Sequence, residues 1–219
     1  MKKIIINADD FGMSRVFNEV ILELLKGDFI KSTSVLVTRD VNNQTDQVGE
    51  LIGLAKSKDI SVGLHFESDR NYTTYKEVAK NIERQKDIFV DLFGFKPSHI
   101  DKHKDIYSDE EAVVLFDFAR KNEIYTRRYF PNKVENGIIT SDRTIFILEK
   151  EMGEIEDILS DKKFKSGIIE MIAHPGKFDP DCESSLNKNR EKDYKKIIEL
   201  LPFLEKNHIV VINQKKENF

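Results

Sequence analysis

Short apolar runs alternate with amphipathic stretches along the whole chain. The first run, Ile4-Ile5-Ile6, has the pattern of a strand that is buried on both faces. Later in the sequence, between Arg15 and Lys26, apolar residues recur at the spacing of a helix, and Ser14 is able to cap this helix. The expected strands are 4–6, 33–38, 60–66, 98–103, 123–128, 167–173 and 209–212. The expected helices are 15–26, 47–56, 75–93, 109–121, 152–159 and 190–206.

Other segments follow this pattern less closely. Residues 129–142 contain proline, asparagine and glycine, which favour loops and turns. Residues 144–148 fit either a further strand or the start of a helix. The last helix contains Pro202, and we expect it to be disturbed there, since proline removes a helical hydrogen bond.

The alternation of strands and helices predicts the fold class. It favours an α/β protein with a parallel sheet, either a (β/α) barrel or a doubly wound sheet. Seven or eight mostly parallel strands favour the barrel, in an irregular or incompletely closed form. The chain has no internal repeat, low-complexity linker or shift in composition, so we expect one domain over residues 1–219.

Composition and charge narrow the possible partners. Of the 219 residues, 39% are hydrophobic and 34% are charged, and the net charge is −4. This mild negative charge argues against a general nucleic-acid binder, which usually carries a basic patch. No stretch approaches the about 20 apolar residues that span a bilayer, and the run after Lys3 is too short for a signal peptide, so we expect a cytoplasmic protein without membrane contact. Cys182 is the single cysteine, which excludes an intrachain disulfide.

Polar residues gather where the predicted strands end. Asp9 and Asp10 follow the first strand, His65 ends the third, and His174 follows residues 167–173. Two adjacent buried carboxylates need a metal, basic partners or water, because burying an unpaired charge is costly. Taken singly, His65 fits a structural histidine, and His174 fits a turn before Pro175.

The segment His99-Ile100-Asp101-Lys102-His103 adds a second group of polar residues. In a strand, residues 99, 101 and 103 project to one face, so this face carries His, Asp and His. Imidazole and carboxylate donors suit Zn²⁺ and other divalent transition metals. A histidine that binds a metal needs an acceptor for its other ring nitrogen, and Asp101 fits that role.

Carboxylates and histidines together indicate metal-assisted hydrolysis. The metal polarises a carbonyl, a free carboxylate accepts a proton from water, and a histidine protonates a leaving amine. No competing motif is present: the chain has no G-x-S-x-G, no G-x-G-x-x-G and no P-loop. Cys182 lies in a polar stretch without a recognisable catalytic partner.

Four motifs, in this order, resemble the YdjC-like carbohydrate deacetylases, also called chitooligosaccharide deacetylases. They are Asn7-Ala8-Asp9-Asp10-Phe11-Gly12, Gly63-Leu64-His65-Phe66, His99-Ile100-Asp101-Lys102-His103 and Ala173-His174-Pro175-Gly176. The resemblance runs from about residue 3 to about residue 176. It implies an irregular (β/α) barrel related to the glycoside hydrolase and deacetylase barrels. It also implies one divalent metal ion, Mg²⁺ or Zn²⁺, and hydrolysis of the N-acetyl group of an acetylated amino sugar or a short chitin-type oligosaccharide.

The resemblance also implies roles for individual residues. Asp10, His65 and His103 match the metal ligands, and Asp9 matches the general base that activates water.

Four further residues match supporting roles. His174 matches the group that protonates the leaving amine or steadies the tetrahedral intermediate. Arg127 matches an arginine at a strand end that holds Asp9 or the substrate. His99 and Asp101 match residues that lie behind the ligands.

The chain departs from the family pattern in two places. After His103 it reads Lys104-Asp105-Ile106-Tyr107, where relatives continue with more histidines, and residues 67–74 are shorter than the loop of longer members. Two alternatives therefore remain open: a metal-dependent amidase or phosphoesterase on the same barrel, and a non-catalytic carbohydrate-binding protein. A saccharide is the expected partner, and a homodimer is the default expectation on frequency alone.

Overall fold

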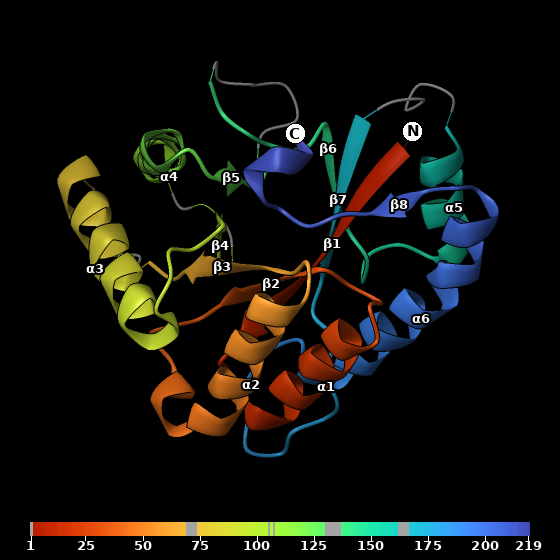
Figure 1. The fold of residues 1–219 in the computed structure, drawn as a ribbon, viewed down its shortest axis with the longest axis horizontal. Helices are drawn as coiled ribbons and strands as arrows, with labels where there is room; N and C mark the ends of the chain where they lie inside the picture. Colours follow the sequence, from red (N-terminus) through yellow and green to blue (C-terminus); the bar gives the residue numbers. More distant parts are fainter. Residues whose placement is uncertain (1, 69–73, 105, 107, 130–136, 162–166) are drawn as a thin grey trace.

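A computed structural model describes residues 2–68, 74–104, 106, 108–129, 137–161 and 167–219. Its centre is a sheet in which every strand pair is parallel (Figure 1). Among the described residues the strands follow the order β5-β4-β3-β2-β1-β7-β6, and β8 pairs with the start of β1. The strands are β1 (Lys2–Phe11), β2 (Ser32–Val35), β3 (Ser61–Phe66), β4 (His99–Lys102), β5 (Tyr125–Thr126), β6 (Arg143–Phe146), β7 (Gly167–Ala173) and β8 (Val210–Val211).

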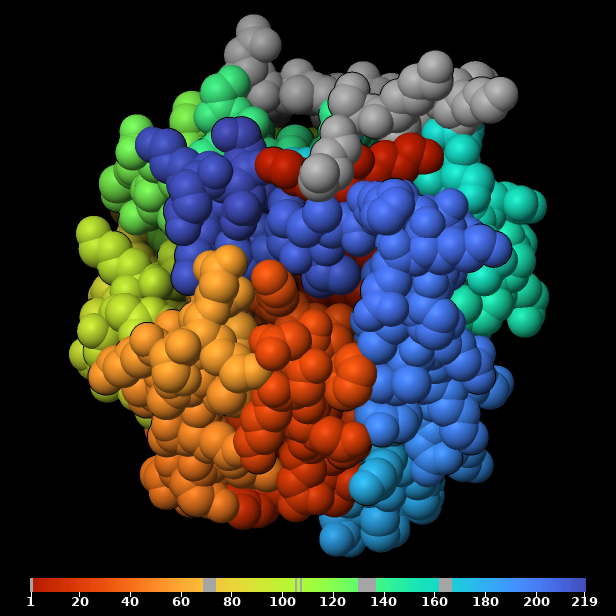
Figure 2. Space-filling model, turned by 45° about the vertical axis from the view of Figure 1, so that its right-hand side comes forward, coloured from red at the N-terminus to blue at the C-terminus, as the bar shows by residue number. Residues whose placement is uncertain are grey.

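Six helices of the described chain surround this curled sheet. They are α1 (Arg15–Lys26), α2 (Thr45–Ser57), α3 (Tyr75–Phe93), α4 (Asp109–Asn122), α5 (Met152–Ser160) and α6 (Arg190–Lys206). Figure 2 shows α1 between two helices, with α2 on one side and α6 on the other. The Tyr194 hydroxyl of α6 donates to Glu23 of α1 at 2.8 Å. No helix in the part of the chain that the structure describes is long and apolar enough to cross a membrane.

The two edge strands of the sheet approach each other without regular pairing. Tyr125 of β5 forms a single parallel bridge with Ile139, in the segment that leads into β6. Next to this bridge, the Thr126 amide donates to the Ile139 carbonyl at 3.0 Å. These contacts confirm the irregular, incompletely closed barrel that the element order predicts.

The first strand is buried on both faces, as its three isoleucines predict. Ile4 and Ile6 join the large core beneath the helices, whereas Ile5 packs with Tyr125 and Ile212 inside the barrel. Because alternate side chains of a strand point to opposite faces, one strand supplies both cores. Burial of both faces of β1 therefore fixes its place at the centre of the sheet.

Most predicted elements are present, and the differences have local causes. The strand expected from residue 123 starts at Tyr125, because Glu123 adopts a left-handed conformation (φ 52°) that ends α4. Residues 144–148 contribute to a strand, β6, rather than a helix. The helix α6 continues through Pro202 to Lys206, so the expected disturbance there does not end the helix. Residues 130–136, within the predicted loop 129–142, lie outside the described residues.

The segment after β8 closes the end of the barrel opposite to the strands' carboxyl ends. β8 pairs with Lys3 and Ile4 at the start of β1. Beyond it, the buried Gln214 side chain donates to Glu170 Oε1 at 3.3 Å, and its amide donates to Ser61 Oγ at 3.0 Å. The last residues of the chain therefore contribute polar groups to the barrel interior.

Candidate active site

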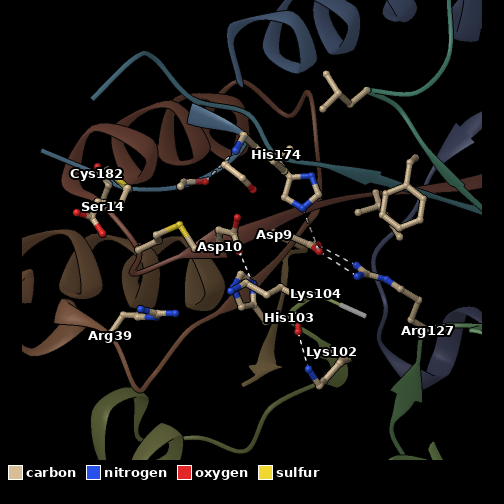
Figure 3. Close-up of a pocket in the computed structure, with 18 of the residues that line it drawn as sticks. Asp9, Asp10, Ser14, Arg39, Lys102, His103, Lys104, Arg127, His174 and Cys182 are labelled. Carbon is tan, nitrogen blue, oxygen red and sulfur yellow. Dashed lines mark hydrogen bonds and ion pairs between the residues drawn. The ribbon is translucent and has the colours of Figure 1, made fainter. Parts of the chain in front are cut away.

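A cavity of about 1810 Å³ lies where the strands end (Figure 3). Asp9 and Asp10 line it from β1, His103 follows β4, Arg127 follows β5 and His174 follows β7. Parallel strands place their carboxyl ends at one edge of the sheet, which is where α/β proteins build their sites. Segments that are far apart in the sequence therefore meet in one pocket.

A β-bulge brings the two adjacent carboxylates into this pocket. Ala8 pairs with Thr33 and Phe11 pairs with Val35, so β1 uses one more residue than β2 over this interval. Asp10 has a left-handed backbone (φ 72°) at this point. In a regular strand Asp9 and Asp10 would point to opposite faces, but the bulge turns both toward the pocket.

Asp10, His65 and His103 form a close triangle of donor atoms. Asp10 Oδ1 lies 3.3 Å from His65 Nε2 and 3.1 Å from His103 Nδ1, and the two nitrogens are 3.2 Å apart. A cation with bonds of about 2.0–2.2 Å to three such ligands requires them to be about 3.0–3.5 Å from one another. Asp10 Oδ1 is buried without a hydrogen-bond partner among the described residues. The donor set, the spacing and this unpartnered oxygen all fit a divalent metal ion.

A carboxylate behind His65 sets the orientation of its ring. His65 Nδ1 lies 2.5 Å from Asp101 Oδ1, which leaves Nε2 facing Asp10. This is the arrangement in which an outer carboxylate fixes a metal-binding histidine. Behind His103, Glu67 Oε1 lies 4.0 Å from Nε2, farther than Asp101 lies from His65. The sequence did not indicate this contact.

Arg127 holds Asp9 with two hydrogen bonds. Its Nη1 and Nη2 donate to the two oxygens of Asp9 at 2.9 and 2.8 Å, and Nη2 also donates to Asp101 at 3.0 Å. On the other side, Nε donates to Glu170 at 3.0 Å. All four side chains are buried, so this charge-assisted network fixes the plane of the Asp9 carboxylate.

His174 faces Asp9 from β7. Its Nε2 lies 3.9 Å from Asp9 Oδ2 (Figure 3). Asp193 of α6 accepts a hydrogen bond from the His174 amide at 2.7 Å and lies 4.0 Å from its Nδ1. The ring therefore lies between a carboxylate in the pocket and a carboxylate on α6, which suits a proton donor.

His99 occupies a different position from the other predicted histidines. Its ring lies against Gly63, where an added Cβ would overlap it, and its Nδ1 lies 3.0 Å from Ser98 Oγ. His103 lines the pocket, and the buried Asp101 contacts His65 and Arg127, whereas His99 makes neither of these contacts. Burial lowers the pKa of His99 to about 4, so the ring is neutral at physiological pH.

Charges in the cluster reinforce one another. Burial opposes the charged imidazole, but the carboxylates of Asp101 and Asp9 outweigh it and raise the pKa of His65 to about 10. Burial also opposes ionisation of Asp10, yet the adjacent imidazoles of His103 and His65 and the Arg190 guanidinium hold its pKa well below the ordinary range. The cluster is thus an anionic oxygen beside imidazoles, and a divalent cation that bound there would replace protons.

The sequence analysis missed two charged residues of α6. Arg190 Nη2 donates to Asp10 Oδ2 at 2.5 Å, and Asp193 contacts His174. Both lie on the buried stripe of the helix, with Ile197, Leu200 and Leu204. A charged residue at such a position needs a partner, so the helical spacing carried a signal that the family motifs did not.

The segment that departs from the family pattern begins in an unusual conformation. Lys104 directly follows His103, has a left-handed backbone (φ 63°) and lines the pocket. The buried Lys102 ammonium donates to the His103 carbonyl at 2.6 Å, which supports this turn. Residues 105, 107 and 69–73 lie outside the described residues, so the predictions about both departures stay predictions.

The curled parallel sheet and the Asp-His-His cluster define a class of barrel proteins with a candidate metal site at the carboxyl ends of the strands. The model of the YdjC-like protein family matches residues 3–200. The chain belongs to this family, which confirms the resemblance carried by the four motifs.

Two relatives with names match this chain over different shares of their length. A chitooligosaccharide deacetylase of Klebsiella pneumoniae subsp. pneumoniae is 26% identical over 57% of this chain, and the match spans 58% of that protein. A carbohydrate deacetylase of Thermoanaerobacter pseudethanolicus is 25% identical, and the match covers 97% of this chain and 98% of that protein.

Solved structures show the same fold. A protein of Enterococcus faecalis V583, described provisionally as a cellobiose-phosphate cleavage protein, has a TM-score of 0.82 at 20% identity, with 97% of each chain covered. A peptidoglycan N-acetylglucosamine deacetylase has a TM-score of 0.62 at 12% identity, with 96% of this chain and 85% of that chain covered. At these identities the likeness concerns the fold alone.

Proposed function

We propose that this protein is a metal-dependent hydrolase that removes the N-acetyl group from an acetylated amino sugar or a short chitin-type oligosaccharide. The observation that carries the proposal is the Asp10–His65–His103 triangle with Asp9 beside it, since the cluster offers three ligands and a separate base. The names of the two relatives, both deacetylases of carbohydrates, support the substrate class.

In this proposal Asp10, His65 and His103 hold one divalent ion. When bound, the ion supplies Lewis acidity toward the acetyl carbonyl oxygen. Two imidazoles and one carboxylate favour Zn²⁺ or a similar transition metal over Mg²⁺, which prefers oxygen ligands. The contact between His65 Nδ1 and Asp101 keeps the His65 ring in the orientation that this role requires.

Asp9 acts as the general base. It accepts a proton from the water whose oxygen attacks the acetyl carbon, and Arg127 keeps its two oxygens in place for that transfer. The new C–O bond forms as the amide becomes tetrahedral.

His174 acts as the general acid. Its Nε2 gives a proton to the nitrogen of the leaving amine as the C–N bond breaks, and acetate and the free amino sugar are released. The Asp193 carboxylate accepts a hydrogen bond from the His174 amide and lies near Nδ1 of the ring. It thereby positions the ring for this step.

The experiment that tests the proposal measures acetate release from N,N′-diacetylchitobiose and N-acetylglucosamine. Chelator-stripped protein is assayed alone and after addition of Zn²⁺ or Mg²⁺. We expect acetate only with metal, and faster release with Zn²⁺. Turnover of phosphoesters or simple amides, with no acetate from either sugar, would move the protein to the alternative hydrolase class. Tight sugar binding without hydrolysis at saturating metal would instead make it a carbohydrate-binding protein.

A further inference from the structure

The guanidinium of Arg190 is fully buried and forms a hydrogen bond with one oxygen of Asp10. The Arg190 side chain has no exposed surface, and Nη2 donates to Asp10 Oδ2 at 2.5 Å. A buried guanidinium is costly unless it is paired and held in a good geometry. Its presence beside the candidate ligand therefore calls for a specific role.

Several segments hold this guanidinium in one position. It lies 3.9 Å over the ring of Phe17 on α1, and Nη2 also lies 3.2 Å from Ser184 Oγ and 3.5 Å from Met13 Sδ. An added Cβ at Gly176 would lie 2.9 Å from the Phe17 ring and 3.0 Å from Arg190 Cδ, so the chain after His174 closes tightly over this pair. Packing from α1, α6 and two loops leaves the side chain little freedom.

The two oxygens of Asp10 consequently have separate partners. Oδ2 accepts from Arg190, whereas Oδ1 faces the nitrogens of His65 and His103 at 3.3 and 3.1 Å. A cation that Asp10 bound through both oxygens would have to share Oδ2 with the Arg190 guanidinium, whose charge-assisted hydrogen bond and positive charge weaken that second metal bond.

We propose that Arg190 is a positioning residue that restricts Asp10 to a single metal-facing oxygen and thereby sets which cations the site accepts. The proposal rests on the metal site of the proposed function. Ca²⁺ takes six to eight oxygens and readily uses both oxygens of one carboxylate, whereas Zn²⁺ is satisfied by four ligands of the imidazole and carboxylate type. Arg190 therefore selects against Ca²⁺ and for Zn²⁺.

The ratio of the two affinities separates this role from simpler ones. Loss of a positive charge near the site, or a loosened α6, changes the affinity for every divalent ion in the same direction and by a similar factor. Only a change in the number of oxygens that Asp10 offers changes the preference between Zn²⁺ and Ca²⁺.

The test measures dissociation constants of Zn²⁺ and Ca²⁺ for the chelator-stripped wild type and for Arg190→Met. Methionine removes the donors and keeps a long apolar side chain above Phe17. We expect the Zn²⁺ preference to fall at least tenfold, which corresponds to about 1.4 kcal/mol. The absorption spectrum of bound Co²⁺ should change as well, since it reports coordination. The matched control is Arg15→Met, which removes a pocket-lining arginine paired with Asp46 and should leave the ratio unchanged.

The outcomes distinguish this inference from the proposed function. An unchanged Zn²⁺/Ca²⁺ ratio and Co²⁺ spectrum in Arg190→Met, with a wild type that binds Zn²⁺, would overturn the inference alone. A wild type that binds none of these ions would overturn the metal site itself. If Arg190→Met does not fold, Arg190→Lys replaces it. Its ammonium keeps the charge, but the side chain ends one bond short of the position of Nη2, so the hydrogen bond to Asp10 Oδ2 weakens and we expect the ratio to fall about threefold. An unchanged ratio there would also refute the role.

Discussion

Asp9 and Asp10, although adjacent in the sequence, face the same nitrogen of His65, at 3.8 Å and 3.3 Å from Nε2. The bulge in β1 and the left-handed backbone of Asp10 make this possible. Their other contacts differ, because Asp9 pairs with Arg127 and Asp10 with Arg190. These separate contacts fit the proposed division of roles, in which Asp9 is the base and Asp10 is a metal ligand.

Replacement of each carboxylate by asparagine should separate these two roles. In Asp9→Asn we expect acetate release to fall by at least about 100-fold with metal still bound, because general base catalysis typically contributes 10²–10⁴-fold. In Asp10→Asn we expect the metal dissociation constant to rise by more than about 100-fold, since even outer partners of ligands contribute 10–100-fold. Metal titration and acetate assays on the same samples check both. Equal loss of metal by the two variants would contradict the division.

Arg127→Lys should slow the reaction without weakening metal binding. A lysine ammonium cannot satisfy Asp9, Asp101 and Glu170 together, so the Asp9 carboxylate loses its fixed plane. We expect kcat to fall about 10- to 100-fold with little change in KM, in line with the loss of a positioned base. Arg120→Lys, on the exposed ion pair of α4, is the control and should behave like the wild type. A normal kcat in Arg127→Lys would show that Asp9 needs no such clamp.

Gly63→Ala should destabilise the protein, because the added methyl group overlaps the His99 ring. Overpacking of this kind typically costs about 1–3 kcal/mol in the free energy of unfolding. The matched control is Gly49→Ala on the exposed side of α2, where nothing lies within 4 Å of the added Cβ. There alanine should stabilise by about 0.4–1 kcal/mol. Urea unfolding of both variants measures the difference, and equal stabilities would disprove the contact.

His99 should make stability fall as the pH decreases below neutrality. Burial lowers its folded pKa to about 4, whereas in the unfolded chain the value is near 6.5, so only the unfolded state gains a proton between these values. Its contribution is complete above pH 6.5 and is lost toward pH 4, by about 3 kcal/mol in total.

A comparison of unfolding free energies at pH 7.5 and pH 5 checks this contribution. The variant His99→Asn does not titrate, so its stability should fall less over this interval than that of the wild type. His208→Asn is the control, since His208 is exposed and its left-handed backbone suits asparagine. Identical pH profiles of the wild type and His99→Asn would show that His99 is not the group responsible.

The sequence predicted the elements best where their boundaries carry a local signal. The structure bears out α3 over Tyr75–Phe93, where Thr74 and Glu77 form a capping box and Gly94 ends the helix. It also bears out β7 over Gly167–Ala173. The strand expected from residue 123 began too early, because the left-handed Glu123 has no glycine or asparagine to mark it.

For the site, the family motifs indicated that Asp9, Asp10, His65 and His103 come together, but not the way in which they meet. The bulge that turns both carboxylates inward depends on pairing with β2, which one strand's sequence does not reveal. Arg190 and Asp193 lie beyond the last motif and contact Asp10 and His174 only through the packing of α6. Tertiary contacts of this kind have no local signature.

The pairing of β1 with β7 and β8 also bears on the order in which the protein folds. The ribosome makes β1 first, yet this strand lacks its two late neighbours until residues 167–211 have followed. Arg190, which anchors Asp10, and Gln214, which reaches Glu170 behind Arg127, are also made late. Contacts between distant residues form slowly, because a long loop must close first. We therefore expect the acidic pair to stay exposed to solvent until these later segments have been made, and the site to be completed late in folding.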